Sequence, residues 1–282
     1  MSAIQTLQWP IPEAGISRFL KILHLSEPSF FGAAILMLVA IAPTAFASLT
    51  DQRSFLGIDV WTKPLKFEAA LAVYLLTLAF FARFLPAGTG ERRWYRVYSS
   101  VVVVAIVAEM VWIGGAAVLG TASHFNRGPI GGILYSVMGL GAVILTTPPA
   151  VYAWLIARDP ASGLSPVVRE ALITGLALTL PLTLLTAGTM ASMEGHAVGG
   201  SGLDTGGFPL MGWVRDGGDL RVAHFFATHS LHFIPLFGLL SLVLFGPSNR
   251  WPVRLFAALF VGFVTWTFVE ALSGRPFLPG IG

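Results

Sequence analysis

Seven long apolar segments limit what this chain can fold into. A helix needs about 20 mostly apolar residues to cross the hydrocarbon core of a bilayer. Segments of about that length cover residues 30–48, 65–85, 99–119, 131–157, 167–190, 222–245 and 253–272. Only 11% of the residues are charged, whereas a soluble domain carries roughly 25%, so the chain cannot cover a water-facing surface. The sequence therefore predicts an all-α fold, a polytopic membrane bundle of about seven transmembrane helices.

One membrane domain is expected, because no period of about 20–50 residues repeats along the chain. We place this domain at residues 29–275, between an N-terminal cytoplasmic segment (1–28) and a C-terminal periplasmic tail (276–282). Arg18 and Lys21 lie among apolar neighbours in the first segment. This pattern predicts a short amphipathic helix that lies on the membrane surface.

The distribution of lysine and arginine predicts the orientation, since cytoplasmic loops collect positive residues. With seven spans, the N-terminus shares a side with the loops after the second, fourth and sixth spans. Ten positive residues fall on that side: Arg18, Lys21, Arg83, Arg92, Arg93, Arg96, Arg158, Arg169, Arg250 and Arg254. Seven fall on the other: Arg53, Lys63, Lys66, Arg127, Arg215, Arg221 and Arg275. We therefore expect the N-terminus in the cytoplasm and the C-terminus in the periplasm of a bacterial inner membrane.

Composition excludes several chemistries. The chain has no cysteine, which rules out disulfides, thiolate-bound zinc, iron–sulfur clusters and covalently attached haem. A formal charge of +3 without a dense basic run gives no reason to expect nucleic acid as a partner. The string Ala45-Phe46-Ala47 has the form of a signal-peptidase site. The stretch before it is long and carries as many acids as bases, which favours a retained first helix.

Five of the six histidines fall on the predicted periplasmic side, and they are the first candidates for function. His124 follows the third span in the string SHFN, and His196 lies in the longest loop. At about 100° per residue, a straight sixth helix places His224, His229 and His232 on one polar face. Polar groups at membrane depth are functional-site candidates, and imidazole rings bind transition metals and haem iron.

The leading prediction is therefore a periplasm-facing site that binds haem b or a transition metal. The metal ligands would be His124, His224 and His229, with His232 or His196 in reserve. The function would then be electron transfer, quinone chemistry or sensing of a small molecule. Two other interpretations of these histidines stay open, namely pH-dependent contact with a substrate and structural hydrogen bonds between helices.

Glu109, about halfway through the third span, is the second candidate. A carboxylate at that depth must be neutral, paired or in contact with water. Two interpretations are open. Glu109 has a functional role, as a proton relay or as a contact for an ion or a quinone, or it is a protonated acid that is hydrogen-bonded to a neighbouring helix. Glu270, nearer the outer end of the seventh span, is similar. In the alternative function, a proton-coupled transporter, these two acids would carry the proton. A third hypothesis is a metal-dependent membrane hydrolase.

Positive residues at the outer boundary predict an anion site. Lys63 and Lys66 lie three residues apart in the string WTKPLKFE, where the second span begins. With Arg221 they would hold a carboxylate, a phosphate or a haem propionate, and Asp219 would orient a histidine ring. The alternative is that both lysines extend to lipid phosphates at the membrane surface.

Three strings, WTKPLKF, SHFN and GGDLRVAHFFATH, resemble those of a family of uncharacterised multi-pass membrane proteins from proteobacteria. The resemblance spans the second, third and sixth helices, over half of the chain. That family has no assigned activity, so the resemblance implies the topology and the choice of residues and no function. The expected partners are the lipid bilayer and a quinone or another small molecule. Whether the protein is an oligomer or a subunit of a complex stays open.

Overall fold

The computed structural model describes residues 15–55, 57–124, 129–160, 162–201, 207–208 and 211–278. Residues 1–14 of the predicted N-terminal segment and 279–282 of the predicted tail lie outside these ranges. Contacts between residues divide the chain into two compact units, Met1–Arg53 with Asp59–Ser165 and Ser54–Ile58 with Pro166–Gly282. The expectation of one domain over 29–275 stays a prediction.

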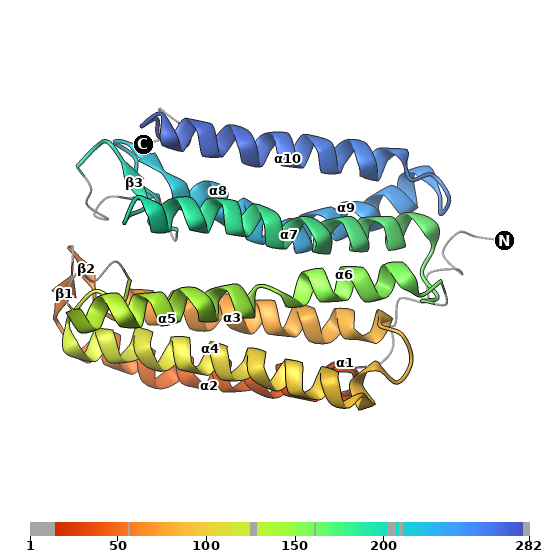
Figure 1. The fold of residues 1–282 in the computed structure, drawn as a ribbon, viewed down its shortest axis with the longest axis horizontal. Helices are drawn as coiled ribbons and strands as arrows, with labels where there is room; N and C mark the ends of the chain where they lie inside the picture. Colours follow the sequence, from red (N-terminus) through yellow and green to blue (C-terminus); the bar gives the residue numbers. More distant parts are fainter. Residues whose placement is uncertain are drawn as a thin grey trace. The chain divides into compact units, whose positions relative to one another are not determined.

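Most of the regular structure in the described residues is α-helical (Figure 1). The first unit contains α1 (Ile16–Ser26), α2 (Pro28–Thr50), α3 (Thr62–Phe81), η2 (Ala82–Phe84), η3 (Thr89–Glu91), α4 (Arg93–Leu119), α5 (Pro129–Leu145) and α6 (Pro148–Arg158). The second contains α7 (Pro166–Ser192), β3 (Ala197–Val198), β4 (Gly218–Asp219), α8 (Leu220–Thr228), α9 (Ser230–Phe245) and α10 (Trp251–Leu272). Two short strands, β1 (Ser54–Phe55) and β2 (Ile58–Asp59), pair with each other before α3.

Six helical segments of the described chain are long and apolar enough to cross a membrane, and the bent pair α8–α9 makes a seventh. The six are Pro28–Thr50, Thr62–Phe84, Arg93–Leu119, Gly131–Arg158, Pro166–Ser192 and Trp251–Leu272. Large apolar side chains such as Val111 and Leu244 are exposed on them, whereas Thr186 and Ser230 are buried. An apolar exterior around a partly polar interior suits contact with lipid. The predicted all-α polytopic bundle of about seven transmembrane helices is confirmed.

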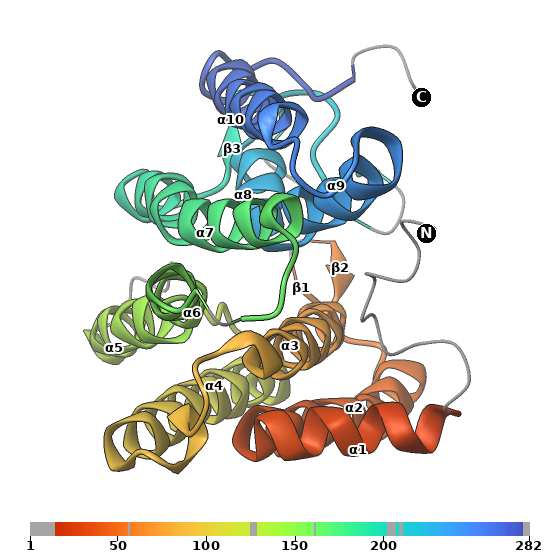
Figure 2. The same cartoon turned by 90° about the vertical axis from the view of Figure 1, so that its right-hand side faces the viewer.

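In the first unit α2, α3 and α4 pack on one another, and the expected short helix, α1, packs on α2 and α3 (Figures 1 and 2). One face of α4 is buried, with spacings that alternate between three and four residues: Tyr95, Ser99, Val102, Ile106, Glu109, Ile113 and Ala116. Such spacing keeps one side of a helix toward its neighbours. Glu109 therefore occupies a packing position within the span.

The fourth predicted span, 131–157, is interrupted. The helix α5 ends at Leu145, and α6 begins with two prolines, which have no backbone N–H to continue α5. The Tyr74 hydroxyl donates to the Leu145 carbonyl oxygen at 2.7 Å, and the Tyr98 hydroxyl lies 2.7 Å from that of Thr147. Tyrosines from α3 and α4 thus satisfy polar groups that the break exposes inside the bundle.

In the second unit α7 packs on α8 and α9, and α10 packs on all three. The axes of α8 and α9 differ by 52° across His229. The structure therefore corrects the straight sixth helix on which the predicted histidine face depended. A close approach to α7 accompanies the bend: a Cβ at Gly175 would lie 2.9 Å from the Ser230 carbonyl oxygen and 2.7 Å from Cδ of Pro235. Only glycine leaves room for this contact.

Candidate functional site

The segment between α2 and α3 is held in place by a network of hydrogen bonds around Asp51 and Arg53. Asp51 accepts from the Arg53 guanidinium at 2.6 Å and from the Trp61 indole at 2.9 Å, and these bonds hold the pKa of Asp51 well below its ordinary value. Arg53 also donates to the Val118 carbonyl oxygen at 2.8 Å, where the last turn of α4 carries partial negative charge. The start of α3, with Lys63, is thereby fixed beside the end of α4.

The Lys63 ammonium contacts His124, so two residues that the sequence singled out separately lie together. Lys63 Nζ is 3.0 Å from His124 Nδ1, and the Ser123 hydroxyl is 3.1 Å from the same nitrogen. Burial, and then the charge of Lys63, lower the pKa of His124 from 6.5 to about 3. The ring is therefore neutral at physiological pH. Because an ammonium only donates, Nδ1 accepts and the ring proton lies on Nε2.

This geometry bears on the predicted metal ligation by His124. In the tautomer that accepts from Lys63, Nε2 carries a proton and has no lone pair for a metal. Ligation would require the ammonium to move away or to lose a proton. The contact therefore favours an electrostatic role for the Lys63–His124 pair, and metal ligation by His124 stays a prediction. Lys66, three residues further along α3, is exposed, and its predicted contact with an anion is likewise untested.

The Glu109 carboxyl lies deeper, on the packed face of α4. Glu109 is 6% exposed, and its buried Oε1 has no hydrogen-bond partner among the described residues. It faces Gly141 of α5, where a Cβ would lie 2.9 Å from Oε1. Lys63 is close enough for its charge to act on this carboxyl. A buried acid with unmet hydrogen-bonding capacity that feels the charge of a cation is a typical setting for a proton-binding group.

A second buried carboxyl, Glu68, was not selected from the sequence. The Thr44 hydroxyl donates to its Oε1 at 2.7 Å, and its Oε2 is buried without a hydrogen-bond partner in the described chain. Glu68 shares the packed face of α3 with Leu71, Leu75 and Leu78. Glu68 could have been identified from the sequence, because an acid there falls on the otherwise apolar face of the predicted second span.

A separate polar network lies near the first turn of α4. The Tyr95 hydroxyl lies 2.7 Å from the Tyr152 hydroxyl, and Tyr95 also interacts with the Glu27 carboxyl. All three side chains are buried, and burial raises the pKa of Glu27 above its ordinary value. The helical rise puts Tyr95 about 21 Å from Glu109 along α4. Fully buried Val102 and Ile106 on the same face form the apolar stretch between them.

The second unit contains His224, His229 and His232, which lie along the bent pair α8–α9. At the bend, His229 Nδ1 is 2.8 Å from the Phe225 carbonyl oxygen, and its ring stacks on that of Phe225. A carbonyl only accepts, so Nδ1 carries the proton and Nε2 keeps its lone pair, as in many metal-ligating histidines. The His232 ring centroid is 5.2 Å away, and His224 Nδ1 lies 3.0 Å from the Thr186 hydroxyl. Within the described residues, no group of three or more histidines and acids is arranged to hold a metal ion.

Asp219 and Arg221, which were predicted to contact a cofactor, are used within the fold. Asp219 caps α8 by accepting from the backbone N–H of Arg221 at 2.9 Å, and it also accepts from that of Val214 at 2.9 Å. It pairs with the Arg221 guanidinium at 2.7 Å, and its side chain is 0% exposed. His196, the reserve ligand, accepts from the Leu220 backbone through its carbonyl. These contacts assign a structural role, and the cofactor role stays a prediction.

Glu270 forms a two-point ion pair with Arg275, with both nitrogen–oxygen distances at 2.7 Å. The pair borders a cavity of about 100 Å³, and none of the described lining residues is a histidine. Both oxygens of Glu270 are thus held by a guanidinium, whereas Oε1 of Glu109 has no hydrogen-bond partner among the described residues. The structure therefore favours Glu109 over Glu270 as a proton carrier.

No family model, curated protein or solved structure matches this chain. The resemblance carried by WTKPLKF, SHFN and GGDLRVAHFFATH stays an expectation. The fold is that of a helical protein that can span a membrane, with a mid-span acid, a partly buried lysine–histidine contact and a histidine pair at a helix bend.

Proposed function

We propose that this protein is a proton-coupled membrane transporter whose first unit carries the proton on Glu109. The observation that carries the proposal is the Glu109 carboxyl, which is buried within a span, has an Oε1 without a hydrogen-bond partner in the described chain, and lies within reach of the Lys63 charge. Burial disfavours the anion of such a carboxyl and the nearby ammonium opposes this effect, so withdrawal of the ammonium would promote binding of a proton.

Three neighbours would assist Glu109. Lys63 supplies the charge that sets the protonation state of the carboxyl, and neutral His124 positions the ammonium through its Nδ1. Gly141 leaves the space into which Oε1 extends. In this scheme water on the His124 side delivers a proton to Oε1, and the same proton leaves Oε1 when the carboxyl faces the other side.

The apolar stretch of α4 explains why proton movement would be coupled to a conformational change. Val102 and Ile106 separate Glu109 from the network of Glu27 and Tyr95. Neither side chain can hold a proton, so a proton crosses only if helices around the stretch rearrange. Movement of a cargo molecule can be linked to that rearrangement. The distribution of positive residues would place the His124 end in the periplasm of a bacterial inner membrane and the Glu27 end in the cytoplasm.

Proton flux into liposomes tests the proposal. The purified protein is reconstituted with a pH-sensitive dye inside, and a pH gradient is imposed. We expect wild-type flux above that of empty liposomes, and loss of the difference in Glu109→Gln. Gly141→Ala should reduce flux, because its Cβ would press on Oε1, while Gly139→Ala, which meets nothing within 4 Å, is the matched control. Equal flux in wild type and Glu109→Gln would contradict the proposal.

A second candidate function is metal binding at the bend of the second unit. The observation that favours it is the His229 tautomer, which leaves Nε2 with a lone pair next to the His232 ring. This pair, with a third ligand from elsewhere, would bind a transition metal for electron transfer or small-molecule sensing, and a haem would use one of the two rings as an axial ligand. Elemental analysis and the visible spectrum of the purified protein test this. We expect bound metal or a Soret band in the wild type, its loss in His229→Ala, and its retention in the His24→Ala control. A metal-free, colourless and fully active protein would exclude it.

A further inference from the structure

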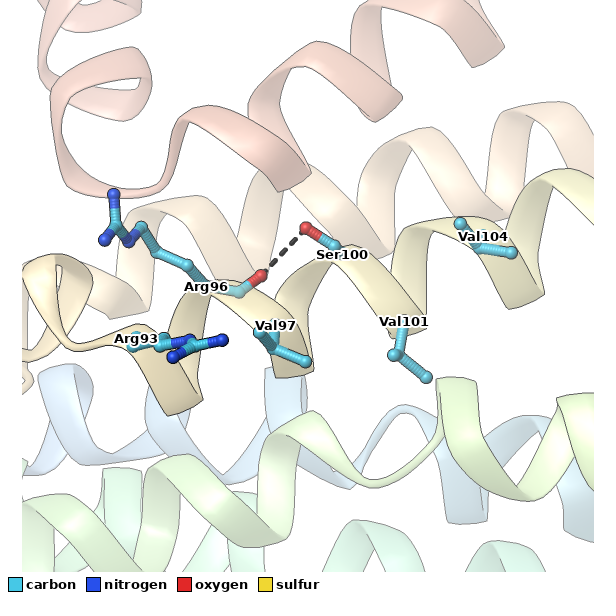
Figure 3. A pocket seen from close by; sticks show the side chains of 6 residues that line it. All are labelled: Arg93, Arg96, Val97, Ser100, Val101 and Val104. Atoms are coloured by element: carbon cyan, nitrogen blue, oxygen red, sulfur yellow. Dashed lines mark hydrogen bonds between the residues drawn. The ribbon is translucent and has the colours of Figure 1, made fainter.

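A groove on α4 lies at the opposite end of that helix from His124. Its volume is about 520 Å³, and its described lining residues are Arg93, Arg96, Val97, Ser100, Val101 and Val104 (Figure 3). Neighbouring members of this set are one or three residues apart, so they form a continuous face over about three turns of α4. The face is charged at one end and apolar at the other.

Two exposed guanidinium groups form the charged end. The ion pairs between described residues involve other arginines, so no described acid neutralises Arg93 or Arg96. The Ser100 hydroxyl donates to the Arg96 carbonyl oxygen at 2.8 Å, which leaves it able only to accept. Guanidinium groups bind phosphate through paired, charge-assisted hydrogen bonds. The charged end therefore fits a phosphate group.

Three valines form the apolar end. Val97, Val101 and Val104 are 56%, 46% and 67% exposed, and on a membrane-spanning helix such side chains contact acyl chains. From Arg93 to Val104 the helix rises by about 16 Å, and one leaflet of the hydrocarbon core is about 15 Å thick. The apolar part of the groove, from Val97 to Val104, accounts for about 10 Å of this rise. A phosphate-binding end that continues into an apolar face over most of one leaflet suits the headgroup and one acyl chain of a phospholipid.

We propose that this groove binds an anionic phospholipid, with the phosphate on Arg93 and Arg96 and one acyl chain along the three valines. The site is separate from Glu109 and does not depend on the proposed transport function. On the topology predicted from positive residues, this end of α4 is cytoplasmic. Anionic lipids are concentrated in the leaflet that faces the cytoplasm in many membranes.

Native mass spectrometry of the full-length protein in detergent tests the proposal, with phosphatidylglycerol and phosphatidylcholine as probes. The wild type should bind phosphatidylglycerol more tightly. The double variant Arg93→Gln/Arg96→Gln should bind it about thirtyfold more weakly, since each arginine near a lipid surface contributes about a fivefold factor. Arg92→Gln is the matched control, because Arg92 immediately precedes α4 and does not line the groove. Its affinity should stay close to that of the wild type.

A variant of the apolar end keeps the test informative if the double variant does not fold. Val101→Trp fills the groove without changing its charge and should weaken binding of both probes. Equal affinity of the wild type for the two lipids would overturn the proposal, as would an equal loss in Arg92→Gln, which would indicate diffuse attraction to the whole arginine cluster. A dimer that persists with added lipid and separates in Val101→Trp would show that a second copy covers the groove, and would also overturn it.

Discussion

Replacing Lys63 with methionine isolates the charge that acts on His124. Burial and that charge together lower the pKa of His124 from 6.5 to about 3, and burial is the larger cause. Lys63 therefore accounts for less than half of a difference of about 3.5 pH units. Unit charges at the observed 3.0 Å interact by about 1.4 kcal/mol in water and about 5.5 kcal/mol at a dielectric constant of 20, which correspond to about 1 and about 4 pH units. Only the water-like end of this range fits, so we expect the titration midpoint of His124 to rise by about 1 to 1.5 pH units.

The assay is ¹⁵N NMR of histidine-labelled protein in detergent micelles, in which six histidines give few signals. His124→Gln assigns the signal. Lys66→Met is the matched control, because it removes an equal charge from an exposed position on the same helix, and it should shift the midpoint less. An unchanged midpoint in Lys63→Met, or a wild-type His124 that titrates at its ordinary value, would show that the Lys63 charge does not act on His124.

Three further predictions concern stability. In Gly238→Ala the new Cβ would overlap that of an alanine in α7, so thermal unfolding in detergent should show a loss of about 1–3 kcal/mol; Gly262→Ala, with nothing within 4 Å, should show none. Asp219→Asn should lower the free energy of unfolding, measured with a chemical denaturant, by up to about 3 kcal/mol. This is the lower end of the range for a buried pair, because the Arg221 side chain is 28% exposed. An unchanged midpoint would show that the pair contributes nothing to stability. Since hydrogen bonds hold the pKa of Asp51 below 3.8, the stability they contribute is fully present above about pH 4 and is lost as the pH falls further. Acid unfolding of Asp51→Asn should lack this dependence, and an unaltered acid profile would contradict it.

The spans could be predicted because length and apolarity are local properties that decide whether a helix can cross a bilayer. The bend at His229 could not be predicted in the same way. Pro235 is visible in the sequence, but the close approach of α9 to Gly175 that accompanies the bend is a contact between residues far apart in the chain. A helical wheel drawn for a straight helix omits this bend, and the shared histidine face stays a prediction.

The residues of the candidate site could be predicted from the sequence, but the contacts between them could not. Lys63, His124 and Glu109 could all be selected from the sequence, because charged or ionisable groups at membrane depth are unusual. Their relationship depends on α3 and α4 packing together, which brings residues 61 positions apart within 3.0 Å. Asp219 was assigned to a cofactor because its hydrogen bonds to the fold cannot be seen in the sequence.

The protonation of Glu109 is the point on which the proposed function most directly depends. Infrared difference spectroscopy of the protein in liposomes measures it, as the band of a protonated carboxyl recorded over about pH 4 to 9. We expect a band that changes with pH, disappears in Glu109→Gln and is retained in Glu68→Gln. A spectrum in which Glu109→Gln removes no pH-dependent band would show that Glu109 does not carry the proton.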